Sequence, residues 1–206
     1  MKSIKGVILG FCFAAMFVSC GNSQAKSSAE ESNAVVENIM SRRSIRKYSA
    51  KPVEREILNS IMECGINAPN AINRQAWEVR VIDNPDMVNK FLTALKQDNT
   101  QAQPTAVEGS FRSAPVLVIV ANDTTFRFSP IDCGLLCENI MLSAWSYGVG
   151  SVCLGSPVDF IENSPQAMQM LGFSENYKPI ICIGMGYPDE SPAAKPRDMS
   201  KVKFID

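Results

Sequence analysis

The chain has 206 residues, of which 46% are hydrophobic and 20% are charged, and its formal net charge is −1. This length and composition are typical of one folded domain with a sizeable hydrophobic core. The near-neutral charge argues against a general nucleic-acid-binding protein, because such proteins are normally strongly basic. We therefore expect no nucleic-acid partner, and a small molecule as the ligand of any local cluster of cations.

The N-terminal residues have the features of an export signal. Two lysines precede the apolar run Val7–Val18, which is short for a membrane-spanning helix and has the length of a signal peptide. The run ends in FVSCGNS, and small residues before a cysteine are similar to a bacterial lipobox. We expect residues 1–19 to be a lipoprotein-type signal peptide and Cys20 to carry the lipid. A plain secretory signal and an uncleaved anchor are the alternatives, and all three place the rest of the chain outside the cytoplasm.

The segment after the signal is mostly small and polar, which predicts a flexible tether over residues 20–33. The folded domain then spans residues 34–206, and the tether holds it at a membrane, on the periplasmic side or at the cell surface.

The first half of this domain alternates between helical patterns and turn signals. It predicts a short helix at Val35–Met40, a helix from Pro52 to Ile66, a turn-rich loop at Asn67–Gln75, a half-buried strand at Trp77–Asp83 and a helix beginning at Asn84-Pro85. Residues Gln97–Ser113 show little periodicity, and we expect a lid or a mobile loop there.

The second half contains the most apolar segments. It predicts a fully buried strand at Pro115–Ala121, a long helix at Ile131–Tyr147, strands at Gly148–Gly155 and Lys178–Gly186, and a tail rich in proline and charge from Tyr187 to Asp206. The long helix is apolar nearly all round, which places it in the centre of the fold or in a subunit interface. Because strands and helices are interspersed without a clean βαβ repeat, we expect a single α+β domain.

Beyond the signal and Cys20 the chain has five cysteines, an odd number with irregular spacing that gives no disulfide framework. Cys133 and Cys137 lie four residues apart on the predicted long helix, a spacing that metal sites also use. The chain contains no histidine, so zinc would need further cysteines or carboxylates. We therefore favour buried apolar cysteines and predict no metal site.

Two groups of cations stand far apart in the sequence. In SRRSIRKYS (Ser41–Ser49), Arg42 or Arg43 is three or four residues from Arg46, so these side chains point the same way if the turn is helical. Guanidinium groups bind phosphate oxygens in pairs, and the nearby Ser44 hydroxyl can add a bond. A solvated basic surface is the alternative.

The second group is Lys195 and Arg197, which flank Pro196 in a segment expected to be extended. Residues i and i+2 of an extended chain face the same way, so both cations can approach one anion. Taken alone, this segment would be an ordinary charged tail.

Four motifs in this order resemble the FMN-dependent nitroreductase family: RRSIRKY, PNAINRQAW, the glycines of GVGSVCLG, and GYP followed by KPR. The resemblance runs from about Ile39 along essentially the whole chain. It implies an α+β sandwich with a central mixed, mainly antiparallel sheet flanked by helices. It also implies an intertwined homodimer that holds FMN in its interface, with Val202–Ile205 packed on the neighbouring subunit.

The resemblance also implies roles for particular residues. The phosphate and ribityl chain of FMN would be held by Arg42, Arg43, Ser44, Arg46, Lys195 and Arg197. A loop that reaches the flavin from the partner subunit would contribute Pro69, Asn70, Ala71, Asn73 and Gln75. The backbone along the isoalloxazine ring would be that of Cys153, Leu154, Gly155 and Ser156. Cys153 is either a packed thiol, which we favour, or a redox partner of the flavin.

The chain shows no catalytic triad, no paired carboxylates and no histidine, so we expect no catalytic side chain. The resemblance implies that flavin N5 carries the chemistry. A ping-pong hydride mechanism would then transfer electrons from NAD(P)H, or from an unknown donor, to a nitroaromatic, a quinone or a similar acceptor. The alternatives are a divergent flavoprotein of the same fold, such as a dehalogenase or a flavin-fragmenting enzyme, and a non-catalytic exported flavin-binding protein.

Overall fold

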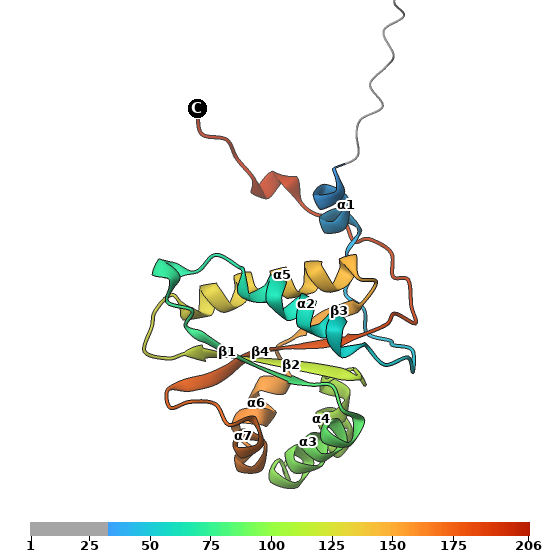
Figure 1. Ribbon diagram of the computed structural model, residues 1–206, viewed down its shortest axis with the longest axis vertical. Coiled ribbons are helices and arrows are strands. Elements are labelled where there is room, and N and C mark those ends of the chain that lie inside the picture. The colour runs from blue at the N-terminus through green and yellow to red at the C-terminus, as the bar shows by residue number, and fades with distance from the viewer. Residues whose placement is uncertain (1–32) are drawn as a thin grey trace, which may run out of the picture. The chain divides into compact units, whose positions relative to one another are not determined.

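A four-stranded antiparallel sheet separates two layers of helices in residues 33–206, the part of the chain that this computed structural model describes (Figure 1). The strands are β1 (Trp77–Ile82), β2 (Val116–Asp123), β3 (Gly150–Leu154) and β4 (Tyr177–Gly186), in the spatial order β1-β2-β4-β3. Every pair of neighbouring strands is antiparallel, and within residues 33–206 only an isolated bridge between Ser44 and Ser151 is parallel. The predicted α+β class is confirmed.

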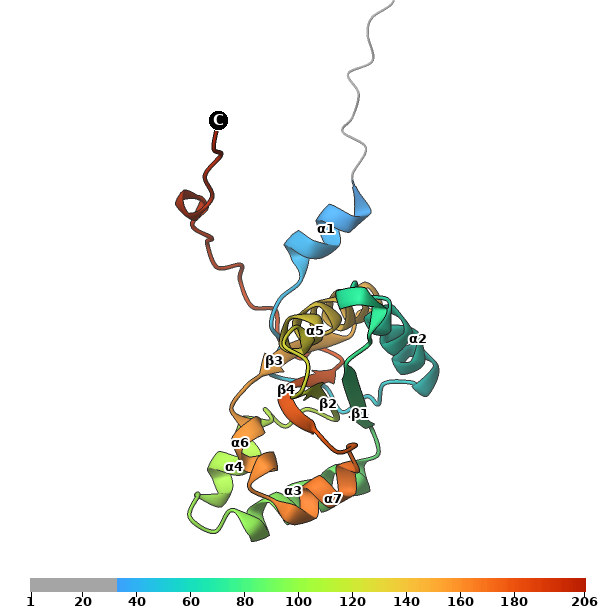
Figure 2. The same cartoon turned by 90° about the vertical axis from the view of Figure 1, so that its left-hand side faces the viewer.

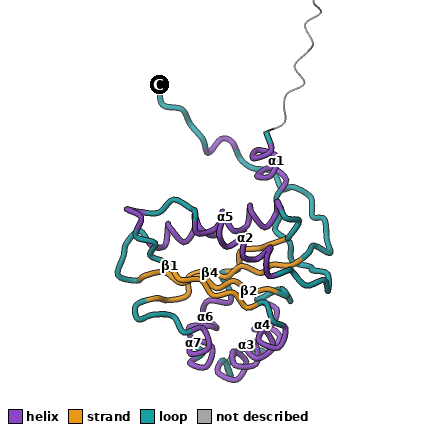
Figure 3. The backbone as a smooth tube through the Cα atoms, in the orientation of Figure 1, coloured by secondary structure: helices purple, strands orange, loops and turns teal. Residues whose placement is uncertain are grey.

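The helices cover both faces of the sheet, as the tube in Figure 3 shows. One face carries α2 (Arg55–Ile66) and α5 (Ser129–Ser146), and the other carries α3 (Pro85–Asp98), α4 (Pro104–Ser110), α6 (Pro157–Glu162) and α7 (Pro165–Leu171). Helix α1 (Ala34–Ser41) precedes the sheet, and short 3-10 helices occur at Ala71–Asn73 and Met199–Lys201. In Figures 1 and 2, α1 and the tail after β4 leave the domain on the side of α5.

Strand β2 lies between two hydrophobic cores, which explains its uninterrupted apolar sequence. Val118 and Val120 face the core under α2 and α5, whereas Leu117 and Ile119 face the core under the other four helices. Successive side chains of a strand point to opposite faces, so a strand with both faces covered has no polar positions in its middle. The predicted fully buried strand is therefore confirmed.

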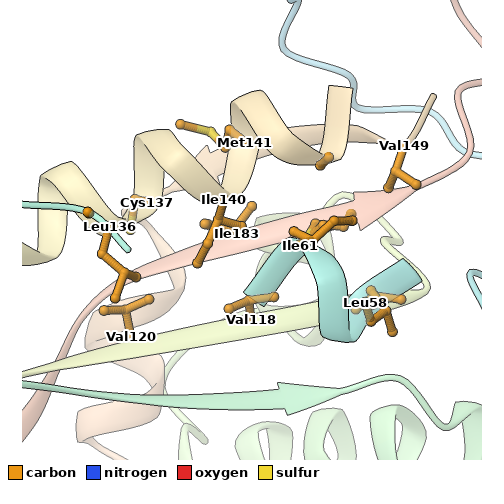
Figure 4. Packing of buried hydrophobic residues seen from close by; sticks show 14 of the residues in the cluster. Leu58, Ile61, Val118, Val120, Leu136, Cys137, Ile140, Met141, Val149 and Ile183 are labelled. Atoms are coloured by element: carbon orange, nitrogen blue, oxygen red, sulfur yellow. The ribbon is translucent and has the colours of Figure 1, made fainter. Parts of the chain in front are cut away.

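Helix α5 presents one face to the sheet and another to solvent. Figure 4 shows Leu136 and Ile140 of α5 lying over Val118 and Val120 of β2. On the outer face, Ile131 is 62% exposed. The helix is thus packed on the sheet as predicted, but the described residues leave part of its apolar surface uncovered.

The prediction of a lid or mobile loop at Gln97–Ser113 is wrong. Helix α3 continues to Asp98, and α4 follows from Pro104 to Ser110. Val107 and Phe111 are buried in the core below the sheet. A helix of seven residues spans two turns, which is too short for helical periodicity to stand out from its polar neighbours. Helices α6 and α7 have six and seven residues and were not predicted either.

Three further predictions concern the N-terminus and the cysteines. The signal peptide, the tether up to Ser32 and the lipid site at Cys20 lie outside the described residues, so they stay predictions. Among the described residues, Cys133, Cys137 and Cys182 are buried, and no group of three metal-binding side chains occurs. No helix within residues 33–206 has the length and apolarity needed to cross a membrane.

Candidate functional site

Cations from the two ends of the domain line one cavity of about 460 Å³. Its lining residues are Ile39, Met40, Arg42, Arg43, Ser44, Arg46, Glu138, Pro192, Ala193, Ala194, Lys195 and Arg197. All six residues predicted to hold an anion are in this set. The structure therefore brings together two groups of cations that are about 150 residues apart in the sequence. We call this site the basic cavity.

Backbone pairing brings the two groups together. Ile45 N–H donates to the Ser151 carbonyl of β3 at 3.0 Å, next to the parallel bridge of Ser44. The approach is close because Gly150 has no side chain: a Cβ there would lie 2.7 Å from Ile45 Cγ1. On its other side the segment of residues 44–48 pairs with the chain after β4, through an antiparallel bridge between Tyr48 and Pro188.

The arginines are not arranged on a helical turn, so the predicted reason for their convergence is wrong. Helix α1 ends at Ser41, and Arg42 already has ψ near 136°, an extended value. Arg43 Nη1 donates to the Met40 and Arg42 carbonyl oxygens, each at 2.8 Å, which folds this guanidinium back over the end of α1. The extended strand-like pairing of the segment, and not helical spacing, directs these side chains into one cavity.

The cations of the basic cavity have no carboxylate partners within the described part of the chain. None of the five salt bridges there involves Arg42, Arg46 or Lys195. Arg197 Nη1 donates to the Lys195 carbonyl at 3.0 Å, so among the described residues this guanidinium bonds only to the backbone of its own segment. Unpaired cations around a concave surface are the arrangement that binds an anion such as a phosphate.

The loop after α2 is held in a strained conformation. Ile72, Asn73 and Gln75 have positive φ values of 52°, 54° and 50°. Positive φ is a genuine outlier for a β-branched residue, and each such residue costs on the order of 1–3 kcal/mol. The Ile72 side chain is also 86% exposed. The domain therefore keeps an apolar side chain at the tip of a strained loop, where it contacts little of its own chain.

Two side chains of neighbouring elements fix this loop. The Asp132 carboxylate of α5, only 2% exposed, accepts a hydrogen bond from Ala71 N–H at 3.1 Å. Arg74 forms a salt bridge of 3.2 Å with Asp123 at the end of β2. Both contacts lie near the N-terminal end of α5, so the loop is anchored there.

The loop and the basic cavity lie at different ends of α5 in one protomer. Asn38 of α1 donates to the Leu142 carbonyl at 2.9 Å, which places the cavity beside the C-terminal half of the helix. Leu142 and Asp132 are ten residues apart, or roughly 15 Å along a helix that rises 1.5 Å per residue. The described protomer therefore does not bring Pro69, Asn70, Ala71, Asn73 and Gln75 into the basic cavity with the cations.

Strand β3 pairs through Ser151 with Ser44 of the basic cavity, but no residue of β3 lines the cavity. Cys153 Sγ lies 3.6 Å from Met141 Sδ of α5, and part of the Cys153 side chain is exposed. Desolvation raises the pKa of the Cys153 thiol, the Glu138 carboxylate raises it further, and the Arg42 guanidinium opposes both effects. The thiol is therefore protonated at neutral pH.

The three residues after Cys153 differ in their burial. Leu154 is buried in the core below the sheet, so only its backbone is available to a ligand. Gly155 and Ser156 are exposed, and a Cβ on Gly155 would meet nothing within 4 Å. The space beside Gly155 is therefore open, and the predicted approach of this backbone to a flavin stays a prediction.

Two acidic residues at this site were not predicted from the sequence. Asp132 anchors the strained loop, and Glu190 accepts hydrogen bonds from the backbone N–H groups of Arg46 and Lys47. The sequence did contain a signal for Asp132, because it is an acidic residue in the first turn of a largely apolar helix. If such a helix is buried, an acidic side chain on it needs a specific polar partner. For Glu190 no signal was present, because an acidic residue in a charged tail is ordinary.

Comparisons with known proteins give the class of this fold and site. A sequence profile of the Nitroreductase family matches residues 39–187. A protein of Methanothermobacter thermautotrophicus, provisionally named NADH dehydrogenase/NAD(P)H nitroreductase, is 30% identical over 166 residues, which are 78% of this chain and 81% of that protein. The NADPH-flavin oxidoreductase of Vibrio harveyi is 28% identical and aligns with 80% of this chain and 70% of its own length.

Solved structures give the same class. A nitroreductase with bound FMN from Bacteroides fragilis superposes with a TM-score of 0.72 at 26% identity, covering 85% of this chain and 100% of that chain. One from Desulfitobacterium hafniense, also with bound FMN, has the same TM-score, identity and coverage. This chain belongs to the nitroreductase family. The predicted family is confirmed.

Proposed function

We propose that this chain is an FMN-dependent oxidoreductase that transfers electrons from a reduced donor, NAD(P)H or another, to a nitroaromatic, a quinone or a similar acceptor. The observation that carries this proposal is the basic cavity, in which cations from residues 42–46 and 195–197 surround one space. Membership of the nitroreductase family and the FMN bound in two solved relatives support the choice of cofactor.

The residues of the basic cavity fit a flavin monophosphate. Arg42, Arg43, Arg46, Lys195 and Arg197 would hold the phosphate, and the Ser44 hydroxyl would bind the phosphate or the ribityl chain. Each charge-assisted hydrogen bond contributes about 1.5–3 kcal/mol, so two or three are enough to fix such a group. When bound, FMN would supply a ring that accepts hydride from the donor and passes electrons to the acceptor in a ping-pong cycle.

The working unit in this proposal is a homodimer. The loop with Asn70 and Asn73 cannot reach the cations of its own protomer, so we assign it to the flavin site of a second copy. Its exposed Ile72 and the exposed Phe204 and Ile205 of the tail, which are 86%, 88% and 91% accessible, would be covered there. In the same arrangement the backbone of residues 153–156 would follow the edge of the ring.

The test of this function is spectroscopic. The purified full-length chain should be yellow or should take up FMN, and released chromophore should have the mass of FMN. The bound flavin should bleach with dithionite or NAD(P)H and recover when a quinone or nitroaromatic is added. A colourless chain that does not take up FMN would contradict the proposal. Flavin binding without oxidation of any donor would instead favour the non-catalytic binding protein.

We also propose that the enzyme is exported and held at a membrane through lipid on Cys20. The apolar run before FVSCGNS and the polar residues up to Asn33 support this proposal. Mass spectrometry of the mature N-terminus should find a lipid-modified Cys20, and Cys20→Ser should release the protein from the membrane fraction. A mature chain that starts at Met1 without lipid would contradict it.

A further inference from the structure

Glu190 joins the two halves of the basic cavity. Its Oε1 accepts hydrogen bonds from Arg46 N–H at 2.5 Å and from Lys47 N–H at 3.2 Å. Next to it, Asp189 N–H donates to the Lys47 carbonyl at 3.0 Å. A carboxylate bound to two successive backbone N–H groups makes charge-assisted hydrogen bonds, which are stronger than those between neutral groups.

Glu190 is also the last residue before the tail cations that is hydrogen-bonded to the domain. In the described chain, the hydrogen bonds beyond it connect tail residues only to one another, as between Arg197 and Lys195 and between Ser200 and Asp198. Only four residues separate Glu190 from Lys195. Such a short link restricts where the two cations can be once Glu190 is fixed.

We propose that Glu190 is a positioning residue, which holds Lys195 and Arg197 at the phosphate position by binding the backbone of Arg46 and Lys47. This inference rests on the proposed function, because it takes FMN phosphate as the anion of the cavity. Its physical basis is entropic: without the anchor the tail samples many conformations, and binding FMN must then order it again.

The direction in which FMN affinity changes on removal of the Glu190 carboxylate distinguishes a positioning role from a purely electrostatic one. A carboxylate near a phosphate site repels the phosphate, so removing it should strengthen FMN binding if Glu190 contributes only its charge. If Glu190 holds the tail, its removal should weaken FMN binding despite the lost repulsion. The two effects change the dissociation constant in opposite directions.

The test measures the dissociation constants of FMN and riboflavin for full-length variants. Glu190→Ala should weaken FMN binding about tenfold and leave riboflavin binding unchanged. Glu190→Gln, whose amide oxygen can still accept both hydrogen bonds, should restore most of the FMN affinity. Asp189→Ala is the matched control, because it removes a neighbouring carboxylate whose side chain makes no hydrogen bond or salt bridge within the described residues. It should not weaken FMN binding.

The same Glu190 substitution is then made in a variant that lacks both tail cations. In Lys195→Ala/Arg197→Ala, the additional Glu190→Ala change should cause no further loss of FMN affinity, because it acts through those cations. Tighter or unchanged FMN binding by Glu190→Ala, or an equal loss in the two backgrounds, would overturn the inference. If the unaltered protein binds no FMN, the proposed function fails, and the inference fails with it. Failure of the inference alone would leave FMN binding by the unaltered protein intact.

Discussion

Replacing Lys195 and Arg197 together with alanine should weaken FMN binding by roughly two to four orders of magnitude. Both side chains line the basic cavity, and each charge-assisted hydrogen bond to phosphate contributes about 1.5–3 kcal/mol. The loss of two such bonds is about 3–6 kcal/mol, and every 1.4 kcal/mol changes a dissociation constant tenfold. Riboflavin has the same ring but no phosphate, so its affinity should change little. Titration with each flavin, followed by flavin fluorescence, gives both constants.

The tail contains its own control for this prediction. Lys201 and Lys203 carry the same charge a few residues further on and do not line the basic cavity. Lys201→Ala/Lys203→Ala removes two positive charges from the tail and should leave FMN affinity nearly unchanged. An equal loss in the two double variants would mean that the tail attracts FMN only by its overall charge. An equal loss for riboflavin would mean that the tail acts on the ring or on the fold.

Replacing Asp132 with leucine should abolish most flavin binding without unfolding the domain. The Asp132 carboxylate is buried and holds Ala71 of the strained loop, so the loop should leave its conformation when the acceptor is lost. Leucine keeps the branching of the aspartate side chain at Cγ but is larger and accepts no hydrogen bond. Overpacking of this kind typically costs about 1–3 kcal/mol, which is less than the usual stability of a folded domain. Asp132→Asn keeps an oxygen acceptor and should retain flavin. Absorbance of bound flavin measures the loss of binding, and circular dichroism shows whether the domain is still folded.

Mixed dimers show whether the loop works in the partner's site. Asp132→Leu protomers have an intact basic cavity, and Lys195→Ala/Arg197→Ala protomers have an intact loop. In a heterodimer of these two, one site combines both intact parts, so flavin should return to one of the two sites. If the loop served the cavity of its own protomer, neither site would be intact and the heterodimer would stay without flavin.

Secondary-structure elements were predicted correctly where a long run of residues has a pattern set by burial. Strand β2 was predicted from an apolar run, and the structure places that run between two cores. Helix α3 was predicted from Asn84-Pro85, and the Asn84 side chain does cap it by accepting from the backbone of Asp86 and Met87. Helix α4 was missed because two turns of polar and small residues carry no periodic signal, although Phe111 beside it is buried.

The geometry of the site was not predicted from the sequence. The cations of the basic cavity were predicted as one set, because their order along the chain resembled a family. The way they meet depends on the pairing of Tyr48 with Pro188 and on the contact between Ile45 and Gly150. Such long-range contacts follow from tertiary packing, and local spacing does not contain them. The strained backbone at Ile72 was not predicted either, because positive φ is rare for isoleucine and no sequence rule predicts it.

A crystal structure of the full-length protein with FMN would show whether cations from residues 42–46 and from residues 195–197 bind one phosphate. We expect the phosphate within hydrogen-bonding distance of at least one cation from each group of the same protomer, with the ring between two copies of the chain. A phosphate held by only one group, or bound away from the basic cavity, would contradict this expectation.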